Sequence, residues 1–120
     1  MLGCNESSQS GKTGHPSKPR TILDISMRNA SSKAIDWVKL EWEGPDVPGG
    51  IIPPSTSKTT LGVEWPSVRD AVIAFVDDQT RKRYHISVPL QAINQRIIAG
   101  SYRKVTFRIL DYEKVEVVCE

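Results

Sequence analysis

The chain has 120 residues, of which 38% are hydrophobic and 25% are charged, and its formal net charge at pH 7 is +2. This length predicts a single domain, and the charged fraction is ordinary for a globular protein. So small a net charge does not indicate a nucleic-acid-binding protein, and the sequence has no run of about 18 apolar residues that would span a bilayer as a helix.

The first segment, residues 1–20, is rich in Ser, Gly, Lys and Pro and has no aromatic or β-branched aliphatic residue. Such a segment cannot bury enough apolar area to offset the entropy lost on ordering. We therefore expect a flexible tether over residues 1–20 and a folded domain over residues 21–120.

Within this tether, Leu2-Gly3-Cys4 resembles the cleavage site of bacterial lipoproteins, in which the Cys becomes the lipidated N-terminus. The charged and apolar segments that precede such a site are not in this sequence, so an unmodified Cys in a polar leader is the alternative. The resemblance implies lipidation of Cys4 and a periplasmic location on the membrane, most often the outer membrane. It also implies that Cys4 and Cys119 form no disulfide, because lipidation consumes the first thiol.

The next segments alternate in hydropathy with the period of β-strands. Residues 21–28 place Leu23, Ile25 and Met27 on one face, and residues 29–33 have the composition of a turn. A second strand over 38–42 has Trp42 in register with its apolar face, whereas Trp37 is out of that register. We expect Trp42 in the core and leave Trp37 unassigned.

A proline-rich segment over residues 44–55 follows, with four prolines and three glycines. This density excludes regular helix and predicts an ordered loop or a crossover between sheets. Residues 56–63 are rich in Thr and predict an edge strand, which ends before the turn at Trp65 and Pro66. We expect Trp65 in the core at one end of the domain, with an exposed interface anchor as the alternative.

The strongest local pattern is a hairpin over residues 71–90. Residues 71–76 are apolar on both faces, which predicts a central strand, and residues 77–80 supply turn chemistry. Residues 84–90 alternate, and Pro89 confines that strand to an edge or to a strand end. Residues 91–99 predict one or two turns of helix closed by Gly100, or an irregular connection. Residues 102–110 and 115–119 then predict a final hairpin.

About seven short strands with at most one short helix predict an all-β fold, an antiparallel sandwich of immunoglobulin-like type. A small closed barrel is the alternative. Each feature with catalytic potential has a simpler structural explanation. His15 and His85 have no second ligand at metal spacing, Asp77 and Asp78 are typical turn formers, and Cys119 has no neighbour that would lower its pKa. We expect no enzyme activity, no metal and no cofactor.

Two groups of basic residues, 81–83 and Arg103, Lys104 and Arg108, form one basic face if the strands bring them together. Solvated turns and strand edges are the alternative. Few aromatic residues accompany these charges, so base stacking on nucleic acid is not expected. A protein partner or an anionic membrane surface remains compatible with them.

The segment from Gly49 to Pro66, together with Cys4, resembles small periplasmic lipoproteins of Gram-negative bacteria, some of which are immunity partners of toxins delivered by type VI secretion. This resemblance implies a membrane-tethered binding protein that neutralises a secreted toxin by stoichiometric binding. A structural envelope lipoprotein and a carbohydrate-binding module are the alternatives. The residues expected to contact the partner are Asp46, Ile51, Trp65, Asp77, Asp78, Arg81, Lys82 and Arg83.

Overall fold

A computed structural model describes residues 21–66, 68–100 and 102–120 of the chain. The expected tether over residues 1–20, with Cys4 and its lipidation, lies outside the described residues. No helix within the described ranges is long and apolar enough to cross a membrane.

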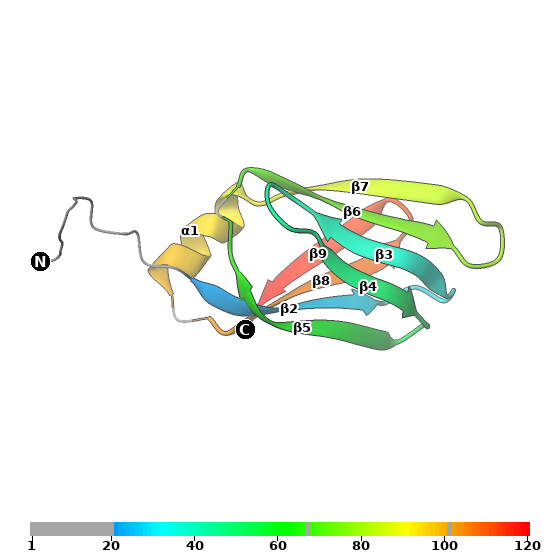
Figure 1. Cartoon of the computed structure of the whole chain (residues 1–120), viewed down its shortest axis with the longest axis horizontal. Coiled ribbons are helices and arrows are strands. Elements are labelled where there is room, and N and C mark those ends of the chain that lie inside the picture. The colour runs from blue at the N-terminus through cyan, green and yellow to red at the C-terminus, as the bar shows by residue number, and fades with distance from the viewer. Residues whose placement is uncertain (1–20, 67, 101) are drawn as a thin grey trace, which may run out of the picture.

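Eight strands and one helix make up the described domain (Figure 1). Six of the strands agree within two residues with segments predicted from the sequence, β3 begins three residues before the predicted strand over 38–42, and the helix occupies residues 91–99 as expected. The elements are β2 (Ile22–Asn29), β3 (Ile35–Glu41), β4 (Val47–Ile52), β5 (Thr56–Glu64), β6 (Asp70–Asp77), β7 (Arg83–Pro89), α1 (Gln91–Ala99), β8 (Lys104–Asp111) and β9 (Lys114–Cys119).

The strands form two four-stranded sheets with the orders β5-β2-β8-β9 and β4-β3-β6-β7. Both sheets are open, so the all-β sandwich is confirmed and the closed barrel does not apply. As expected, β6 is central, β5 is an edge strand, and Pro89 ends the edge strand β7. One pairing departs from the antiparallel expectation, because β2 and β8 run parallel, with Ile25 opposite Val105.

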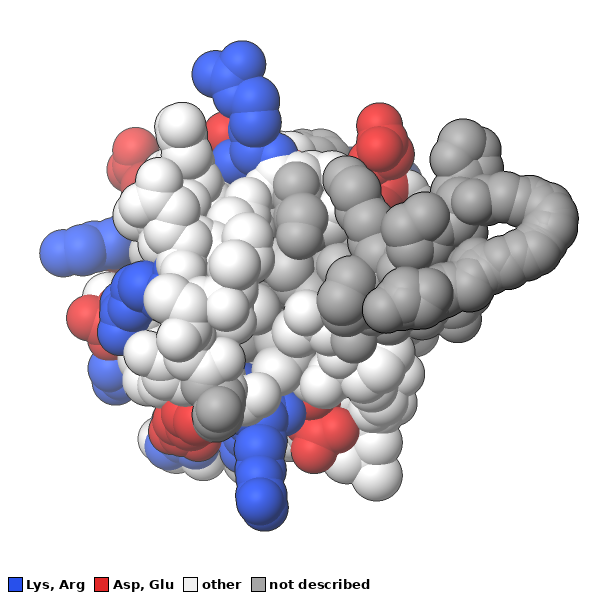
Figure 2. Space-filling model, turned by 90° about the vertical axis from the view of Figure 1, so that its left-hand side faces the viewer, with Lys and Arg blue, Asp and Glu red and all other residues white. Residues whose placement is uncertain are grey.

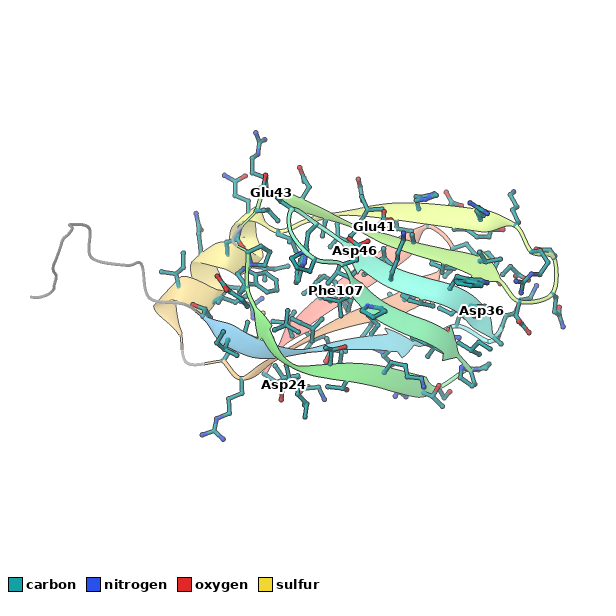
Figure 3. The ribbon with its side chains drawn as sticks, in the orientation of Figure 1. Asp24, Asp36, Glu41, Glu43, Asp46 and Phe107 are labelled. Atoms are coloured by element: carbon teal, nitrogen blue, oxygen red, sulfur yellow. The ribbon has the colours of Figure 1, made fainter. Side chains whose placement is uncertain are left out.

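The core lies between the two sheets and consists of their inward-facing apolar side chains. Phe75 on β6 and Phe107 on β8 are the largest fully buried side chains, and each comes from a central strand of its sheet. Figure 3 labels Phe107 between the two layers. Burial of this kind stabilises the fold by about 25 cal/mol for each Å² of apolar surface removed from water.

The proline-rich segment contains the eighth strand, which the sequence did not predict. Strand β4 occupies Val47–Ile52 at the edge of its sheet, and the chain then changes to the other sheet at β5. An edge position tolerates Pro48 because one side of the strand needs no partner. Gly50 has φ +63, and the pairing with β3 shifts register beside it. The expected loop is therefore wrong for residues 47–52, whereas the expected change of sheet is correct.

Helix α1 closes one end of the sandwich, the helix end, where the loop 42–46 and residues 65–66 and 68–69 also lie (Figure 1). The Trp65 ring is only 5% exposed, as expected for a core residue, and its Nε1 donates to Asn94 Oδ1 on the helix at 2.7 Å. Trp42 meets this ring edge to face, with centroids 5.4 Å apart. Figure 2 shows this end, where the described Lys, Arg, Asp and Glu side chains lie around the rim.

The opposite end, the turn end, carries the connections 30–34, 53–55, 78–82 and 112–113. Asn29 is fully buried there, although the sequence placed it in a turn. Its Nδ2 donates to the carbonyls of Lys33 at 2.7 Å and Ile52 at 2.9 Å, and its Oδ1 accepts from the Ser31 backbone N–H at 3.0 Å. Asn29 thus joins three segments through one side chain, and a buried amide is tolerated because it is paired.

Candidate binding surface

The outer face of the β4-β3-β6-β7 sheet carries a hollow of about 520 Å³, larger than the hollow of the other sheet, which is described below. It lies over β3, β6 and β7 and extends to the hairpin connection 78–82. Polar and apolar side chains share its lining, as is usual for a recognition site. The lining residues are Trp37, Lys39, Glu41, Ala74, Phe75, Val76, Arg81, Arg83, Tyr84 and His85.

Trp37 is the most exposed aromatic side chain of this surface, at 68%. Its backbone has φ +51, a left-handed conformation that is costly for a residue with a Cβ, and the pairing of β3 with β6 shifts register between Asp36 and Lys39. This β-bulge explains why Trp37 falls out of the alternating pattern of its strand. The bulge turns a large indole outward, where it contributes nothing to the core.

Asp36 connects the bulge to the hairpin tip, which is the connection 78–82 between β6 and β7 together with Arg83. One carboxylate oxygen accepts from the Trp37 backbone N–H at 2.7 Å, and the other lies 3.6 Å from the Arg81 guanidinium. Figure 3 labels Asp36 near the turn end of β3. The same carboxylate therefore contacts the backbone of the exposed indole and a cation of the neighbouring hairpin.

The floor of the hollow is apolar because β6 is apolar on its outer side as well as on its inner side. Ala74 is buried there between its register partners Lys39 on β3 and His85 on β7. Val76 lies in the next row, opposite Asp36 and Arg83. The sequence correctly identified β6 as apolar on both faces, and the outer of these faces is the floor of a surface hollow.

The charges of the hollow are mainly basic. Lys39 contacts Glu41 at 2.8 Å and Asp46 at 3.9 Å, and its hydrogen bond with Glu41 raises the pKa of Lys39. Arg81 lies 3.5 Å from Asp78 as well as near Asp36. Arg83 has no ion pair with any residue in the described ranges, and its guanidinium is therefore available to an acidic partner.

Asp77 begins the hairpin connection and is buried, so it offers no surface for a partner. Its Oδ1 accepts from the backbone N–H groups of Gln79 at 2.8 Å and Thr80 at 2.9 Å, which is the turn chemistry the sequence indicated. Its Oδ2 accepts from the Tyr112 hydroxyl on the β8–β9 turn. Asp77 thereby ties the turns of the two sheets together, and its burial gives no support to the expected role in partner contact.

This hydrogen bond shifts the pKa of both groups. The Tyr112 hydroxyl, followed by the Thr80 N–H, lowers the pKa of Asp77 to about 2. Burial, followed by the hydrogen bond from its own hydroxyl to Asp77, raises the pKa of Tyr112 to about 12. Tyr112 also stacks in a tilted arrangement on Tyr84, with centroids 4.4 Å apart. The turn end is therefore held by one charged hydrogen bond and an aromatic cluster.

The remaining expected contact residues are divided between the two ends of the sandwich. Trp65 is buried at the helix end, so the alternative of an exposed anchor is wrong. Asp46 also lies toward the helix end, while the exposed Ile51 lies near the turn end on β4. The exposed Asp78, Arg81, Lys82 and Arg83 stay together at the hairpin tip, where the Lys82 Nζ lies 5.5 Å from the centroid of the Tyr84 ring.

The two basic groups of the sequence do not form one face. Residues 81–83 belong to the β6–β7 hairpin, whereas Lys104 and Arg108 lie on β8 of the other sheet. Sequence reasoning missed Trp37 as a surface residue, although its position out of register was the available signal. Positive φ at a non-glycine residue has no comparable signature in the sequence.

No group of three or more His, Cys, Asp or Glu side chains suited to a metal ion occurs among the described residues. Burial raises the pKa of the Cys119 thiol and outweighs the opposite effect of the Arg96 charge, which the sequence did not indicate.

No protein-family model and no curated protein matches this sequence. Among solved structures, the chain is similar to a protein from Eubacterium rectale determined by NMR. The two chains are 12% identical, the match covers 82% of this chain and 87% of that chain, and the TM-score is 0.48. A likeness of this size carries no argument about function.

Proposed function

We propose that this protein acts by binding another protein on the outer face of the β4-β3-β6-β7 sheet. The observation that carries the proposal is Trp37, a largely exposed indole fixed in a left-handed bulge beside a hollow with an apolar floor. Exposed Trp and Arg side chains are enriched among the residues that contribute most to binding at protein interfaces. A strained backbone that turns an indole outward is readily explained if the indole contacts a partner.

The partner surface should be acidic. Arg83 lacks a carboxylate partner within the described domain, and Arg81 is shared between the largely buried Asp36 at 3.6 Å and the exposed Asp78 at 3.5 Å. A carboxylate from the partner would complete these contacts and would steer association by charge. The rigid sheet beneath the site keeps the entropy cost of binding low.

In its specific form, the proposal is a periplasmic immunity protein, anchored to the outer membrane through lipidated Cys4, that neutralises a secreted toxin. The support for this form is the resemblance of Gly49 to Pro66 and of the Leu2-Gly3-Cys4 segment to lipoproteins. Stoichiometric inhibition requires a surface that covers an active site and needs no catalytic group of its own. A structural envelope lipoprotein would use the same tether without the toxin.

The contact surface is tested with the full chain as bait. A captured protein is identified, purified and titrated against the wild type, Trp37→Ala and Leu61→Ala by calorimetry. We expect Trp37→Ala to weaken the affinity by about 30-fold, since an anchor residue contributes about 2 kcal/mol. Leu61 is 74% exposed on β5 of the other sheet, so Leu61→Ala is the matched control and should bind normally. Equal affinities for all three proteins would place the interface elsewhere.

The basic part of the surface is tested by charge reversal with the same partner. Arg83→Glu should weaken binding about tenfold and should reduce its salt dependence, because one favourable charge becomes unfavourable. Lys58→Glu on β5 makes the same change of charge away from the hollow and is the control. If both variants bind alike, the attraction depends on net charge rather than on this site.

The immunity role is tested by growth. The captured partner, directed to the periplasm, should arrest growth, and co-expression of the full chain behind a lipoprotein signal sequence should restore it. Trp37→Ala should not restore growth. Cys4→Ser should move the protein from the membrane fraction to the soluble periplasm. Unchanged fractionation of Cys4→Ser would contradict the proposed lipid anchor. A captured partner that is not toxic would favour the structural lipoprotein.

A carbohydrate-binding module is the second candidate, because the indole of Trp37 shares its hollow with Glu41 and His85. Sugar rings stack on exposed indoles while neighbouring polar groups accept and donate hydrogen bonds to their hydroxyls. Soluble cell-wall oligosaccharides should then change the tryptophan fluorescence of the wild type with saturation, but not that of Trp37→Ala. Saturable binding would favour this candidate over the protein partner.

A further inference from the structure

The outer face of the other sheet, β5-β2-β8-β9, carries a second hollow of about 390 Å³ with a different chemistry. Its centre is formed by Ser26 on β2 and Thr106 on β8, which lie directly opposite each other in the parallel pair. The inward neighbours on both strands belong to the core, so these two side chains point away from it. The complete lining is Ser26, Arg28, Ser57, Lys104, Thr106, Arg108, Val118 and Glu120.

Both central hydroxyl side chains are buried although they lie on an outer face. Ser26 is 1% exposed and Thr106 is 9% exposed. The Ser26 hydroxyl meets the Thr59 hydroxyl at 3.1 Å, whereas the Thr106 hydroxyl makes no hydrogen bond within the described ranges. A buried hydroxyl without a partner costs about 1–3 kcal/mol, so an unpartnered one at the floor of a hollow points to a ligand that supplies the partner.

Three cations surround these hydroxyls. Arg28 and Arg108 lie directly opposite each other on the two central strands, an arrangement that is unfavourable for like charges. Arg108 pairs with Glu116 on β9, while the nearest polar contact of Arg28 is the Ser57 hydroxyl at 3.4 Å. Lys104 has no ion pair in the part of the chain that the structure describes.

Three carboxylates lie near the three cations, but only that of Glu120 belongs to the lining of the hollow. Glu116 is engaged by Arg108, and Glu120 lines the hollow next to Lys104, with which it exchanges backbone hydrogen bonds at 2.8 and 3.0 Å. Asp24, opposite Lys104 in the register, accepts from the Gly62 N–H at 3.1 Å. An anion between the two guanidinium groups would therefore relieve their repulsion without displacing an existing ion pair of Arg28 or Lys104.

We propose that this hollow is a binding site for a phosphate group. Two guanidinium groups, an ammonium group and a hydroxyl floor present donors from several directions, which suits an anion with three or four acceptor oxygens. Arginine forks match phosphate oxygens in pairs, and charge-assisted hydrogen bonds are about twice as strong as neutral ones. The phosphate group belongs either to a soluble molecule or to a lipid head group.

The site is tested by NMR titration of the full chain with inorganic phosphate, with sodium chloride in the reference titration at the same ionic strength. The amide signals of Ser26 and Thr106 should shift with saturation in phosphate and stay unchanged in chloride. Arg28→Gln should weaken binding about tenfold, since it removes one charged pair of donors. Arg69→Gln removes an exposed arginine that lines neither hollow and is the matched control, which should bind as the wild type does.

Thr106→Val keeps the shape of the floor and removes only its hydroxyl. It should weaken phosphate binding about threefold while its spectrum in the absence of phosphate remains that of a folded protein. Absence of saturable shifts in the wild type overturns the site. Equal binding by Arg28→Gln, Thr106→Val and Arg69→Gln also overturns it, because phosphate would then bind without using this site.

The source of the phosphate group is decided by two further titrations. Vesicles of phosphatidylcholine with phosphatidylglycerol should bind the wild type and release it on addition of inorganic phosphate if the ligand is a lipid head group. A soluble phosphate monoester that binds more tightly than inorganic phosphate, with no binding to these vesicles, identifies a small molecule. The partner-binding surface on the other sheet is unaffected by either outcome.

Discussion

The two sheets bury the same kind of side chain between them but present different chemistry on their outer faces. The outer face of β4-β3-β6-β7 has an apolar centre at Ala74 and Val76, with the indole of Trp37 beside it. The outer face of β5-β2-β8-β9 has hydroxyls at its centre, Ser26 and Thr106, with cations around them. Strand alternation thus decides the core, while the outward residues of the central strands decide what each face can bind.

The largest expected effect tests the hydrophobic core that the two sheets share. Phe75→Ala and Phe107→Ala should each lower the free energy of unfolding by about 3–5 kcal/mol, because each leaves a cavity in the common core. Chemical denaturation monitored by circular dichroism measures both values. Leu61→Ala is the exposed control and should change the free energy by less than about 0.5 kcal/mol. A large effect from only one phenylalanine would show that the sheets do not share one core.

The next effect concerns the hydrogen bond that ties the sheets together at the turn end. Tyr112→Phe should lower the Tm at neutral pH by about 5 °C, because it removes a donor to the buried Asp77 carboxylate. The pKa of Asp77 is depressed to about 2 in the folded protein, against about 3.9 in an unfolded chain. Its stabilisation is therefore complete above pH 4 and is lost as the pH falls toward 2.

The Tm values of the wild type and Tyr112→Phe across pH check the direction of this pH dependence. The difference in Tm should be largest near pH 5 and should shrink as the pH falls toward 2, where protonation of the Asp77 carboxylate removes the charged acceptor from a growing fraction of the folded wild type. At the alkaline end, the raised pKa of Tyr112, about 12, predicts that the wild type loses this stabilisation as the pH rises above 10. A Tm difference that does not vary between pH 2 and pH 5 would contradict the assignment.

A smaller effect concerns the hydroxyls on the outer face of β5-β2-β8-β9. Thr106→Val should raise the free energy of unfolding by about 1 kcal/mol, because it removes a buried hydroxyl that lacks a partner in the described domain. Ser26→Ala should lower it by about 0.5–1.5 kcal/mol, since the Ser26 hydroxyl is paired with Thr59. Urea denaturation without phosphate gives both numbers. Destabilisation by Thr106→Val would mean that its hydroxyl is paired after all.

The smallest effect concerns Trp37 on the outer face of β4-β3-β6-β7. Trp37→Gly should raise the free energy of unfolding by about 0.5–1 kcal/mol, because glycine adopts φ near +51 without strain. Gly62 has φ +66 with open space around the position of a Cβ, so Gly62→Ala is the converse control and should be destabilising by a similar amount. If Trp37→Gly is destabilising, the indole contributes to the fold and need not serve a partner.

Much of this architecture was accessible from hydropathy alone. Alternation located seven of the eight strands, and helix α1 was identified from the spacing of Ile93, Ile97 and Ile98 before Gly100. Strand β4 was missed because Pro48 and the glycines argue against a strand unless its edge position is known. The parallel pairing of β2 with β8 was also missed, since a single sequence does not report which distant strands become neighbours.

The candidate surfaces were harder to foresee than the fold. Asp77 and Asp78 are adjacent in sequence, but one is buried under Tyr112 and the other is exposed, and only the three-dimensional arrangement separates them. The exposure of Trp37 depends on a β-bulge, which the local composition does not predict. Ser26 and Thr106 are unremarkable polar residues in alternating strands until their strands pair and bring the two hydroxyls together.

The parallel neighbours β2 and β8 also set an order of events during folding. Ile25 and Val105 lie next to each other in the sheet but are separated by most of the chain, so closing this contact carries a large loop entropy. Hairpins such as β6–β7 can form locally and early, whereas one side of β2 stays unpaired until β8 arrives. During synthesis from the N-terminus, β2 emerges before the other described strands. Its pairing on both sides is complete only after β8 has been made. The slow phase of refolding should therefore report the docking of the β8–β9 hairpin onto β2.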